Sequence, residues 1–252
     1  MALRRFYIEK ENLQGDDLKI SGDLFHHIRE VCRFDQGSQF EVLLGDHQAH
    51  LIEVTEVNKR ELFGRRLSTR LLPALKKPLI TLCLSIPKLP KVDWIIEKCV
   101  ELGASEIRPF VSDYSFLRKE SEISENRIAR WEKIKQGATQ QSGRGDLLKI
   151  GAPTNLKKLL EEFNRTKGAG GLFPYEGESQ TALPKALKEL KARNLEQLWV
   201  FVGSEGGFSL EEVKLFAQFG LNPVSMGEQI LRVETACLAL VSVIKYELGQ
   251  ED

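Results

Sequence analysis

The chain has 252 residues, of which 42% are hydrophobic and 29% are charged, and its 36 basic residues equal its 36 acidic ones. This composition excludes a disordered or fibrous protein, and the length suffices for one large domain or two smaller ones. Because the net charge is zero, any binding of nucleic acid must come from a local basic patch.

Short segments with alternating hydrophobicity fill the first 72 residues. Apolar residues recur with a period of two at Phe40, Val42 and Leu44 and again in the run at 51–57, Leu62 stands beside Phe63 in the run at 62–67, and turn-forming pairs separate these runs. This pattern predicts a small meander or barrel of antiparallel strands, with one short helix at 26–32.

A basic patch follows in the same region, between Lys59 and Lys77. It holds one acid, Glu61, and seven basic residues, which are Lys59, Arg60, Arg65, Arg66, Arg70, Lys76 and Lys77. The patch is either a surface for RNA phosphates or a solvated strand face.

The pattern changes at Pro73 and Pro78, where we predict the boundary between a first domain, residues 1–72, and a second domain, residues 73–252. Beyond it, short apolar runs alternate with amphipathic helices, which is typical of a parallel α/β sheet. The predicted strands are 79–85, 106–111, 147–150, 171–174, 198–203 and 223–226.

Three helices carry local signals in the second domain. One spans 92–102 and ends at Gly103, and another follows a capping box made by Ser209 and Glu212 and ends at Gly220. The last helix, 234–248, is apolar around its whole circumference, so it must be buried on more than one side. We expect one face on the sheet and another on a partner subunit, with complete burial inside a monomer as the alternative.

The four cysteines, Cys32, Cys83, Cys99 and Cys237, lie far apart in apolar segments and form no CxxC pair. We therefore expect buried free thiols and no disulfide. The amino-terminal segment lacks an apolar signal region, and no run of about 18 apolar residues occurs, so we expect a cytoplasmic protein outside the membrane.

Between the predicted strand at 198–202 and the capped helix lies a glycine loop, Gly203 to Phe208. In parallel sheets ligands bind beyond the carboxyl ends of strands, where glycines let the backbone approach them, although such a turn can also be purely structural. The chain has no GxxxxGK[ST] motif, which excludes a P-loop nucleotide hydrolase. The glycine cluster at 168–171 precedes a strand instead of joining a strand to a helix, so we interpret it as a turn.

Several segments, in order, carry a resemblance to a known family. They are Arg4 to Tyr7, His26-His27 with Arg33, Lys98 to Gly103, Arg130-Trp131 followed by Gln140 to Arg144, Gly203 to Phe208, and Met226 to Ala236. In these the chain resembles the SPOUT class of methyltransferases and, within it, the 16S rRNA (uracil(1498)-N(3))-methyltransferases, whose later segments read approximately RWxxIxxxAxxQSGR, GPEGGF and LGxRILRxETA. The departures are Ser204 in place of proline, and Gln229 and Tyr114 in place of arginines.

The resemblance implies a PUA-like RNA-binding β-barrel, followed by a SPOUT domain with a mostly parallel sheet, helices on both faces and a carboxyl-terminal trefoil knot. It also implies a homodimer that uses S-adenosylmethionine to methylate N3 of a uridine in 16S ribosomal RNA of the small ribosomal subunit, without a metal. The cofactor residues implied are Phe173, Pro174, Tyr175, Gly203, Ser204, Glu205, Gly206, Met226, Gly227, Ile230, Leu231, Thr235 and Ala236.

Methylation of N3 requires loss of the proton from a weakly acidic imide, so a base, or a cation that stabilises the uracil anion, should lie near the sulfonium. Arg232 is our first candidate for the cation, and its alternative role is a structural ion pair with Glu234. Glu205 and Glu234 are candidates for the base or for orienting Arg232, and either could instead cap a helix.

Residues expected to contact RNA lie mostly in the first domain. Arginines there would bind phosphates and so position the target without reading its sequence. The set is Arg4, Arg5, Arg29, Arg33, Arg65, Arg66, Gln140, Ser142 and Arg144. Two alternatives stay open, namely a SPOUT methyltransferase for another RNA position and an inactive RNA-binding assembly factor, because a fold alone does not decide function.

Overall fold

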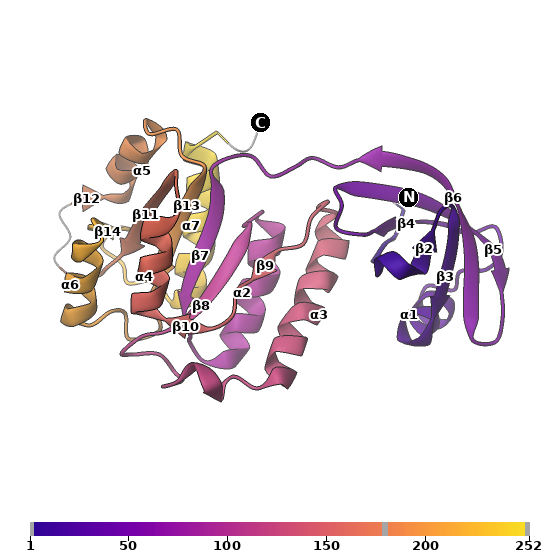
Figure 1. Ribbon diagram of the computed structural model, residues 1–252, viewed down its shortest axis with the longest axis horizontal. Helices are drawn as coiled ribbons and strands as arrows, with labels where there is room; N and C mark the ends of the chain where they lie inside the picture. Colours follow the sequence, from indigo (N-terminus) through magenta and orange to yellow (C-terminus); the bar gives the residue numbers. More distant parts are fainter. Residues whose placement is uncertain (1–2, 178–180, 250–252) are drawn as a thin grey trace. The chain divides into compact units, whose positions relative to one another are not determined.

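The computed structural model describes residues 3–177 and 181–249, and the chain folds as two compact units (Figure 1). The first unit contains the residues up to Ala74 together with Thr139–Leu147, and the second contains Leu75–Ala138 and the chain from Leu148 onward. The long helix α3 (Glu125–Ser142) therefore begins in the second unit and ends in the first. Nothing in the sequence pattern assigned residues 139–147 to the first unit.

A six-stranded sheet forms the first unit, with the strand order β1-β4-β5-β6-β3-β2. Its core is one cluster to which strands from across the sheet contribute, including Phe6, Ile20, Phe40 and Leu62. The elements are β1 (Arg5–Tyr7), η1 (Lys10–Asn12), β2 (Leu13–Gln14), β3 (Asp17–Ser21), α1 (Gly22–His26), the π-helical turn η2 (His27–Val31), β4 (Gln39–Leu43), β5 (Gln48–Val57) and β6 (Glu61–Leu71).

One pairing in this sheet departs from the predicted antiparallel arrangement, because β1 runs parallel to β4. The other strand pairs are antiparallel. Strands joined by a tight turn must be antiparallel, whereas β1 and β4 are separated by several elements, and such a long connection allows the chain to return in the same direction.

The second unit is built on an eight-stranded sheet in which the neighbouring strands pair in parallel. Its strand order is β10-β8-β7-β13-β11-β14-β12, with β9 paired to β8. The strands are β7 (Leu79–Ser85), β8 (Glu106–Val111), β9 (Lys149–Ile150), β10 (Thr154–Asn155), β11 (Ala169–Pro174), β12 (Thr181–Ala182), β13 (Gln197–Val202) and β14 (Pro223–Ser225).

Helices cover both faces of this sheet (Figure 1). Alternate residues of one strand point to opposite faces, so Leu82 and Leu84 pack with α2, α5 and α7, whereas Cys83 packs with α4 and α6. The predicted α/β architecture is thus confirmed, while the threading of a knot stays a prediction. The helices are α2 (Leu89–Glu101), the 3-10 turn η3 (Glu120–Glu122), α4 (Leu156–Arg165), α5 (Leu183–Lys191), α6 (Leu210–Gln218) and α7 (Val233–Glu247).

The glycine cluster at 168–171 is mostly strand, which corrects its interpretation as a turn. Gly168 has the left-handed φ of a turn residue (+70°), but β11 already begins at Ala169. A Cβ on Gly170 would lie 2.3 Å from Leu195 Cδ1, and one on Gly171 would lie 2.7 Å from Leu221 Cδ2. The glycines allow neighbouring side chains to pack closely against the strand, a signal that sequence alone does not distinguish from a turn.

Helix α7 is buried along one side only. Cys237, Leu240 and Ile244 are fully buried in the core, while Val243 and Tyr246 are 40% and 79% exposed. The alternative of complete burial inside a monomer is therefore wrong, and among the described residues nothing covers the outer face of α7. Within the described residues, no helix is both long and apolar enough to cross a bilayer.

Candidate functional site

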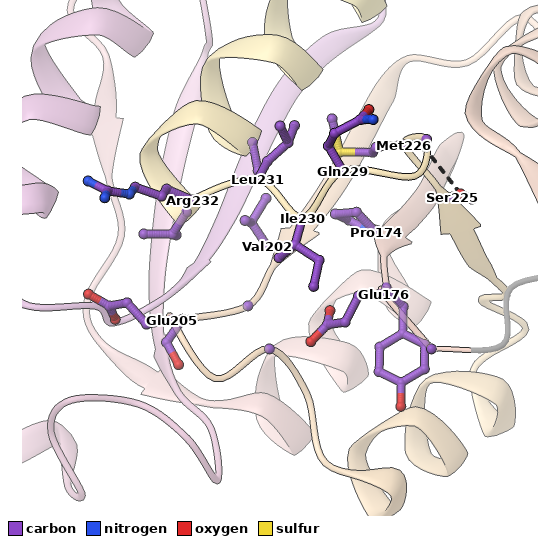
Figure 2. Close-up of a pocket in the computed structure, with 18 of the residues that line it drawn as sticks. Pro174, Glu176, Val202, Glu205, Ser225, Met226, Gln229, Ile230, Leu231 and Arg232 are labelled. Carbon is purple, nitrogen blue, oxygen red and sulfur yellow. Dashed lines mark hydrogen bonds between the residues drawn. The ribbon is translucent and has the colours of Figure 1, made fainter.

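A cavity of about 390 Å³ lies in the second unit, at the carboxyl ends of three neighbouring parallel strands, β13, β11 and β14 (Figure 2). Three chain segments, one after each strand, form most of its wall, and Lys91 from α2 adds to it. This is the position at which open parallel sheets bind ligands, and the volume suits a ligand of the size of a nucleoside derivative. The lining residues are Lys91, Pro174 to Gly177, Val202 to Glu205, Gly207, Ser225 to Val233, and Ala236.

The glycine loop after β13 is held tightly. The Ser204 hydroxyl donates a hydrogen bond of 2.6 Å to the carbonyl of Tyr114, and Gly207 N–H donates to the Ser204 carbonyl at 3.0 Å. A Cβ on Gly203 would lie 2.9 Å from the Cα of Gly207, so only glycine fits there. The loop thus folds back on itself and presents backbone groups to the cavity.

The same loop is anchored downstream by the predicted capping box of α6. The Ser209 hydroxyl accepts from Glu212 N–H at 3.2 Å, and Glu212 Oε2 accepts from Ser209 N–H at 2.9 Å. The other oxygen of Glu212 accepts from Asp113 N–H at 3.0 Å, which ties the start of α6 to the loop after β8. Burial raises the pKa of the Glu212 carboxyl above its ordinary value.

The segment from Met226 to Leu231, which follows β14, has far fewer internal bonds. One side-chain hydrogen bond is found there, from Gly227 N–H to the Ser225 hydroxyl at 3.3 Å. Ile230 lies over the cavity between Val202, Pro174 and Glu176 (Figure 2) and is 82% exposed. A large apolar side chain exposed in a cavity wall is suited to covering a bound ligand.

Charged groups gather at one end of the cavity, where Lys91 binds two carboxylates. Its Nζ lies 3.0 Å from Glu234 Oε2 and 3.3 Å from Glu205 Oε1. These contacts, the one to Glu234 first, raise the pKa of Lys91. Burial acts to raise the pKa of Glu234, but bonds from its own backbone N–H and from Lys91 outweigh it, and the pKa is lowered.

Arg232, at the start of α7, is exposed and extends to the same side of the cavity as Glu205, away from Ile230 and Pro174 (Figure 2). The ion pair with Glu234 that sequence offered as its alternative role is absent from the described residues, because Glu234 pairs with Lys91 instead. The three predicted catalytic residues do meet at one end of the cavity, and their roles stay predictions.

Most residues predicted to bind the cofactor line this cavity, and three do not. Phe173 is fully buried and stacks on Phe216, with ring centroids 4.1 Å apart. Gly206 and Thr235 are exposed outside the lining. Those on the wall are Pro174, Tyr175, Gly203, Ser204, Glu205, Met226, Gly227, Ile230, Leu231 and Ala236.

Sequence reasoning missed Lys91 altogether. It comes from the first turn of α2, after the strand β7, and no motif pointed to it. The other lining residues that were not singled out as cofactor residues adjoin the predicted runs and could have been found by extending each run by one or two positions. They are Glu176, Gly177, Val202, Gly207, Ser225, Glu228, Gln229, Arg232 and Val233.

Several residues predicted to contact RNA hold the first unit together. Gln140 Oε1 accepts a 2.7 Å hydrogen bond from Tyr7 N–H, Arg144 pairs with Asp146 at 2.7 Å, and Arg5 binds Glu41 at 2.9 Å. Ser142 donates weakly to the Thr139 carbonyl, at 3.4 Å. These side chains already have protein partners, so internal contacts account for their positions.

The other residues predicted to bind RNA differ in whether their side chains already have a partner within the protein. Arg66 pairs with Asp16 at 2.7 Å and Arg29 with Asp35 at 3.0 Å, while Arg4 donates to Cys32 Sγ at 2.9 Å. In the basic patch, Arg70 and Lys77 are also paired, with Glu41 and Glu196. Arg33 and Arg65 are exposed and have no ion pair within the described part of the chain.

The cysteines are free, as expected, with Cys83, Cys99 and Cys237 buried and Cys32 half-buried. Over the residues that the structure describes, no cluster of three histidine, cysteine or acidic side chains could hold a metal ion.

Comparison with known proteins matches each unit to a domain family. The profile of a family described as an RNA methyltransferase domain matches residues 75–245, which is more than half of the chain, and that of an RNA methyltransferase PUA domain matches residues 20–65.

Relatives named ribosomal RNA small subunit methyltransferase E match nearly the whole chain. The Buchnera aphidicola (Acyrthosiphon pisum) protein is 26% identical over 97% of this chain and 94% of its own length, and the Bacillus subtilis protein is 26% identical over 97% of both.

Solved structures agree with the sequence relatives. A Legionella pneumophila protein described as a methyltransferase, solved in complex with SAM, has a TM-score of 0.85 and 26% identity and covers 98% of both chains. A ribosomal RNA small subunit methyltransferase E from Neisseria gonorrhoeae, bound to S-adenosyl methionine, has a TM-score of 0.84 at 24% identity, covers 97% of this chain and 98% of its own, and shares the fold.

Proposed function

The chain belongs to the family of RNA methyltransferases whose profile spans residues 75–245, and from this we propose that it transfers a methyl group from S-adenosylmethionine to ribosomal RNA of the small subunit. The observation that carries the proposal is the cavity at the ends of β13, β11 and β14, which is built from two of the segments that carry the family resemblance. The whole-length relatives carry names of that activity.

The volume of the cavity and the chemistry of its lining residues support binding of the cofactor. Gly203 and Gly227 keep backbone groups open to the ligand, and Pro174, Met226 and Leu231 offer apolar surface. Acidic side chains, among them Glu205, line the same wall and suit a positively charged sulfonium. When bound, the cofactor supplies a methyl group that leaves sulfur for a nucleophile while the electron pair of the broken bond stays on sulfur.

We propose N3 of a uridine as the methyl acceptor, following the family resemblance. Its imide proton must leave before or during transfer, and Arg232 would stabilise the anionic base or a neighbouring phosphate. Lys91 is held as a cation by two carboxylates, so it is not the proton acceptor, and Glu205 and Glu234 remain the candidates for that role.

Two further features belong to this proposal. The exposed outer face of α7, which includes Val243 and Tyr246, would be covered by a second copy of the chain in a homodimer. A ribosomal RNA substrate would place the reaction in the cytoplasm.

Methyl transfer can be tested directly. The protein is incubated with labelled S-adenosylmethionine and either small subunits or free 16S RNA from a strain that lacks the modification, and the product is mapped by nuclease digestion and mass spectrometry. We expect one labelled uridine carrying the methyl group at N3. A label at another position would indicate a different RNA target, and tight cofactor binding without transfer would favour an assembly factor.

The role of Arg232 is tested in the same assay. We expect Arg232→Ala to abolish transfer and to leave the affinity for S-adenosylmethionine, measured by calorimetry, largely intact, because the guanidinium would act on RNA. An equal loss of binding and transfer would instead make Arg232 a structural residue.

A further inference from the structure

Lys91 joins three elements at the charged end of the cavity. It projects from the first turn of α2, and its ammonium contacts Glu205 on the glycine loop and Glu234 in the first turn of α7. The lysine side chain is 26% exposed, and the glutamates are 37% and 21% exposed. A single cation therefore engages both carboxylates that are candidates for the proton acceptor.

The second cation at this end, Arg232, has no such partner. Neither an ion pair nor a side-chain hydrogen bond of Arg232 occurs within residues 3–177 and 181–249, although Glu234 is only two residues away. Arg232 also contributes electrostatically to the lowered pKa of Glu234. Arg232 and Glu234 are thus close enough to attract each other, but the Glu234 carboxylate forms its ion pair with Lys91.

Guanidinium groups pair readily with carboxylates and often do so with two hydrogen bonds. If Lys91 were absent, Glu234 and Glu205 would be uncompensated carboxylates beside an unpaired arginine. Arg232 would then move toward them, and its charge would be neutralised before any RNA arrived.

On the basis of the function proposed above, we propose that Lys91 is a positioning residue that occupies Glu205 and Glu234 and so keeps the guanidinium of Arg232 available for the anionic group of the RNA. Lys91 itself need not touch RNA or cofactor in this role. Its effect is that the two carboxylates neutralise the Lys91 ammonium and leave the neighbouring Arg232 guanidinium charged and unpaired.

The same helix offers a matched control. Lys98 lies two turns further along α2 and also binds two glutamates, Glu97 at 2.7 Å and Glu101 at 2.8 Å, but it does not line the cavity. Lys98→Met removes the same kind of contact from the same helix. Any general effect of losing a lysine between two carboxylates appears in both variants.

Steady-state kinetics form the first arm of the experiment. We expect Lys91→Met to lower kcat on the order of tenfold to a hundredfold, as for other misplaced catalytic groups, with the Kd for S-adenosylmethionine changed by less than about threefold. Lys91→Arg should restore most of kcat because it keeps the cation, and Lys98→Met should match the wild type. An unchanged kcat in Lys91→Met, or a parallel loss of cofactor binding, overturns the proposal.

The second arm does not depend on catalysis. The rate at which phenylglyoxal modifies Arg232, followed by mass spectrometry of the peptide, reports whether its guanidinium is free. We expect slower modification in Lys91→Met than in the wild type and in Lys98→Met, and recovery when Glu205→Gln and Glu234→Gln are both added to Lys91→Met. Equal rates in the wild type and Lys91→Met refute the inference about Lys91, whereas absence of methyl transfer by the wild type refutes only the proposed function.

Discussion

The two loops that meet over the cavity, Gly203 to Gly207 and Met226 to Leu231, differ in how they are held. The first is fixed by the bond from Ser204 to the Tyr114 carbonyl, by its own turn and by the capping box of α6. Within the described residues, the second has a single side-chain hydrogen bond, 3.3 Å long, and leaves Ile230 exposed. The glycine loop is therefore preorganised before ligand binding, whereas the second loop presents groups that gain contacts only when a ligand is present.

The largest effect is expected from a substitution that disrupts the glycine loop, Gly203 to Gly207. In Gly203→Ala the new Cβ would lie 2.9 Å from the backbone of Gly207, which cannot move without opening the turn. Overpacking of this kind costs about 1–3 kcal/mol, and we expect the Kd for S-adenosylmethionine, measured by calorimetry, to rise roughly tenfold to a hundredfold.

Gly137→Ala is the control for that change, because nothing lies within 4 Å of a Cβ at that helical position. It should bind the cofactor like the wild type. Unchanged binding in Gly203→Ala would mean that the glycine loop is not preorganised.

An intermediate effect is expected from a substitution in the second loop, Met226 to Leu231. Ile230→Ala removes apolar surface that only a bound ligand would cover, so affinity for S-adenosylmethionine should fall by roughly tenfold at most, from a burial energy of about 1.5 kcal/mol. The melting temperature of the free protein should not change. Leu210→Ala, in an equally apolar and 70% exposed position on α6, should affect neither quantity. A lowered melting temperature in Ile230→Ala would show that the loop is already packed.

The smallest effect is expected from the removal of one hydrogen bond that fixes the glycine loop. Ser204→Ala leaves the Tyr114 carbonyl without its donor, and the loss of one such hydrogen bond costs about 1 kcal/mol, or about 2–4 °C in melting temperature for a protein of this size. Ser225→Ala, which removes the longer bond to Gly227, should cost less. If the two variants have the same melting temperature, the hydrogen bond from Ser204 stabilises the protein no more than the one between Gly227 and Ser225.

Local signals account for the parts of the fold that sequence predicted well. The predicted strands 79–85 and 106–111 have the same bounds as β7 and β8, and the capping box of Ser209 and Glu212 is present at the start of α6. Such features depend on residues within a few positions of each other. The predicted strand at 147–150 is shorter in the structure, where β9 contains only Lys149–Ile150.

The sequence by itself determined the alternation of strands and helices in the second unit, the resemblance to an RNA methyltransferase family, and most of the cavity wall, because each rests on periodicity or on a contiguous motif. Only the tertiary structure decided that Lys91 holds Glu205 and Glu234, and that Gln140 and Arg5 serve packing within the first unit. Those contacts join residues 36 to 143 positions apart along the chain, from the pair Arg5 with Glu41 to the pair Lys91 with Glu234. They arise because the order of strands in each sheet brings distant segments to the same edge, and no local pattern in the chain encodes that order.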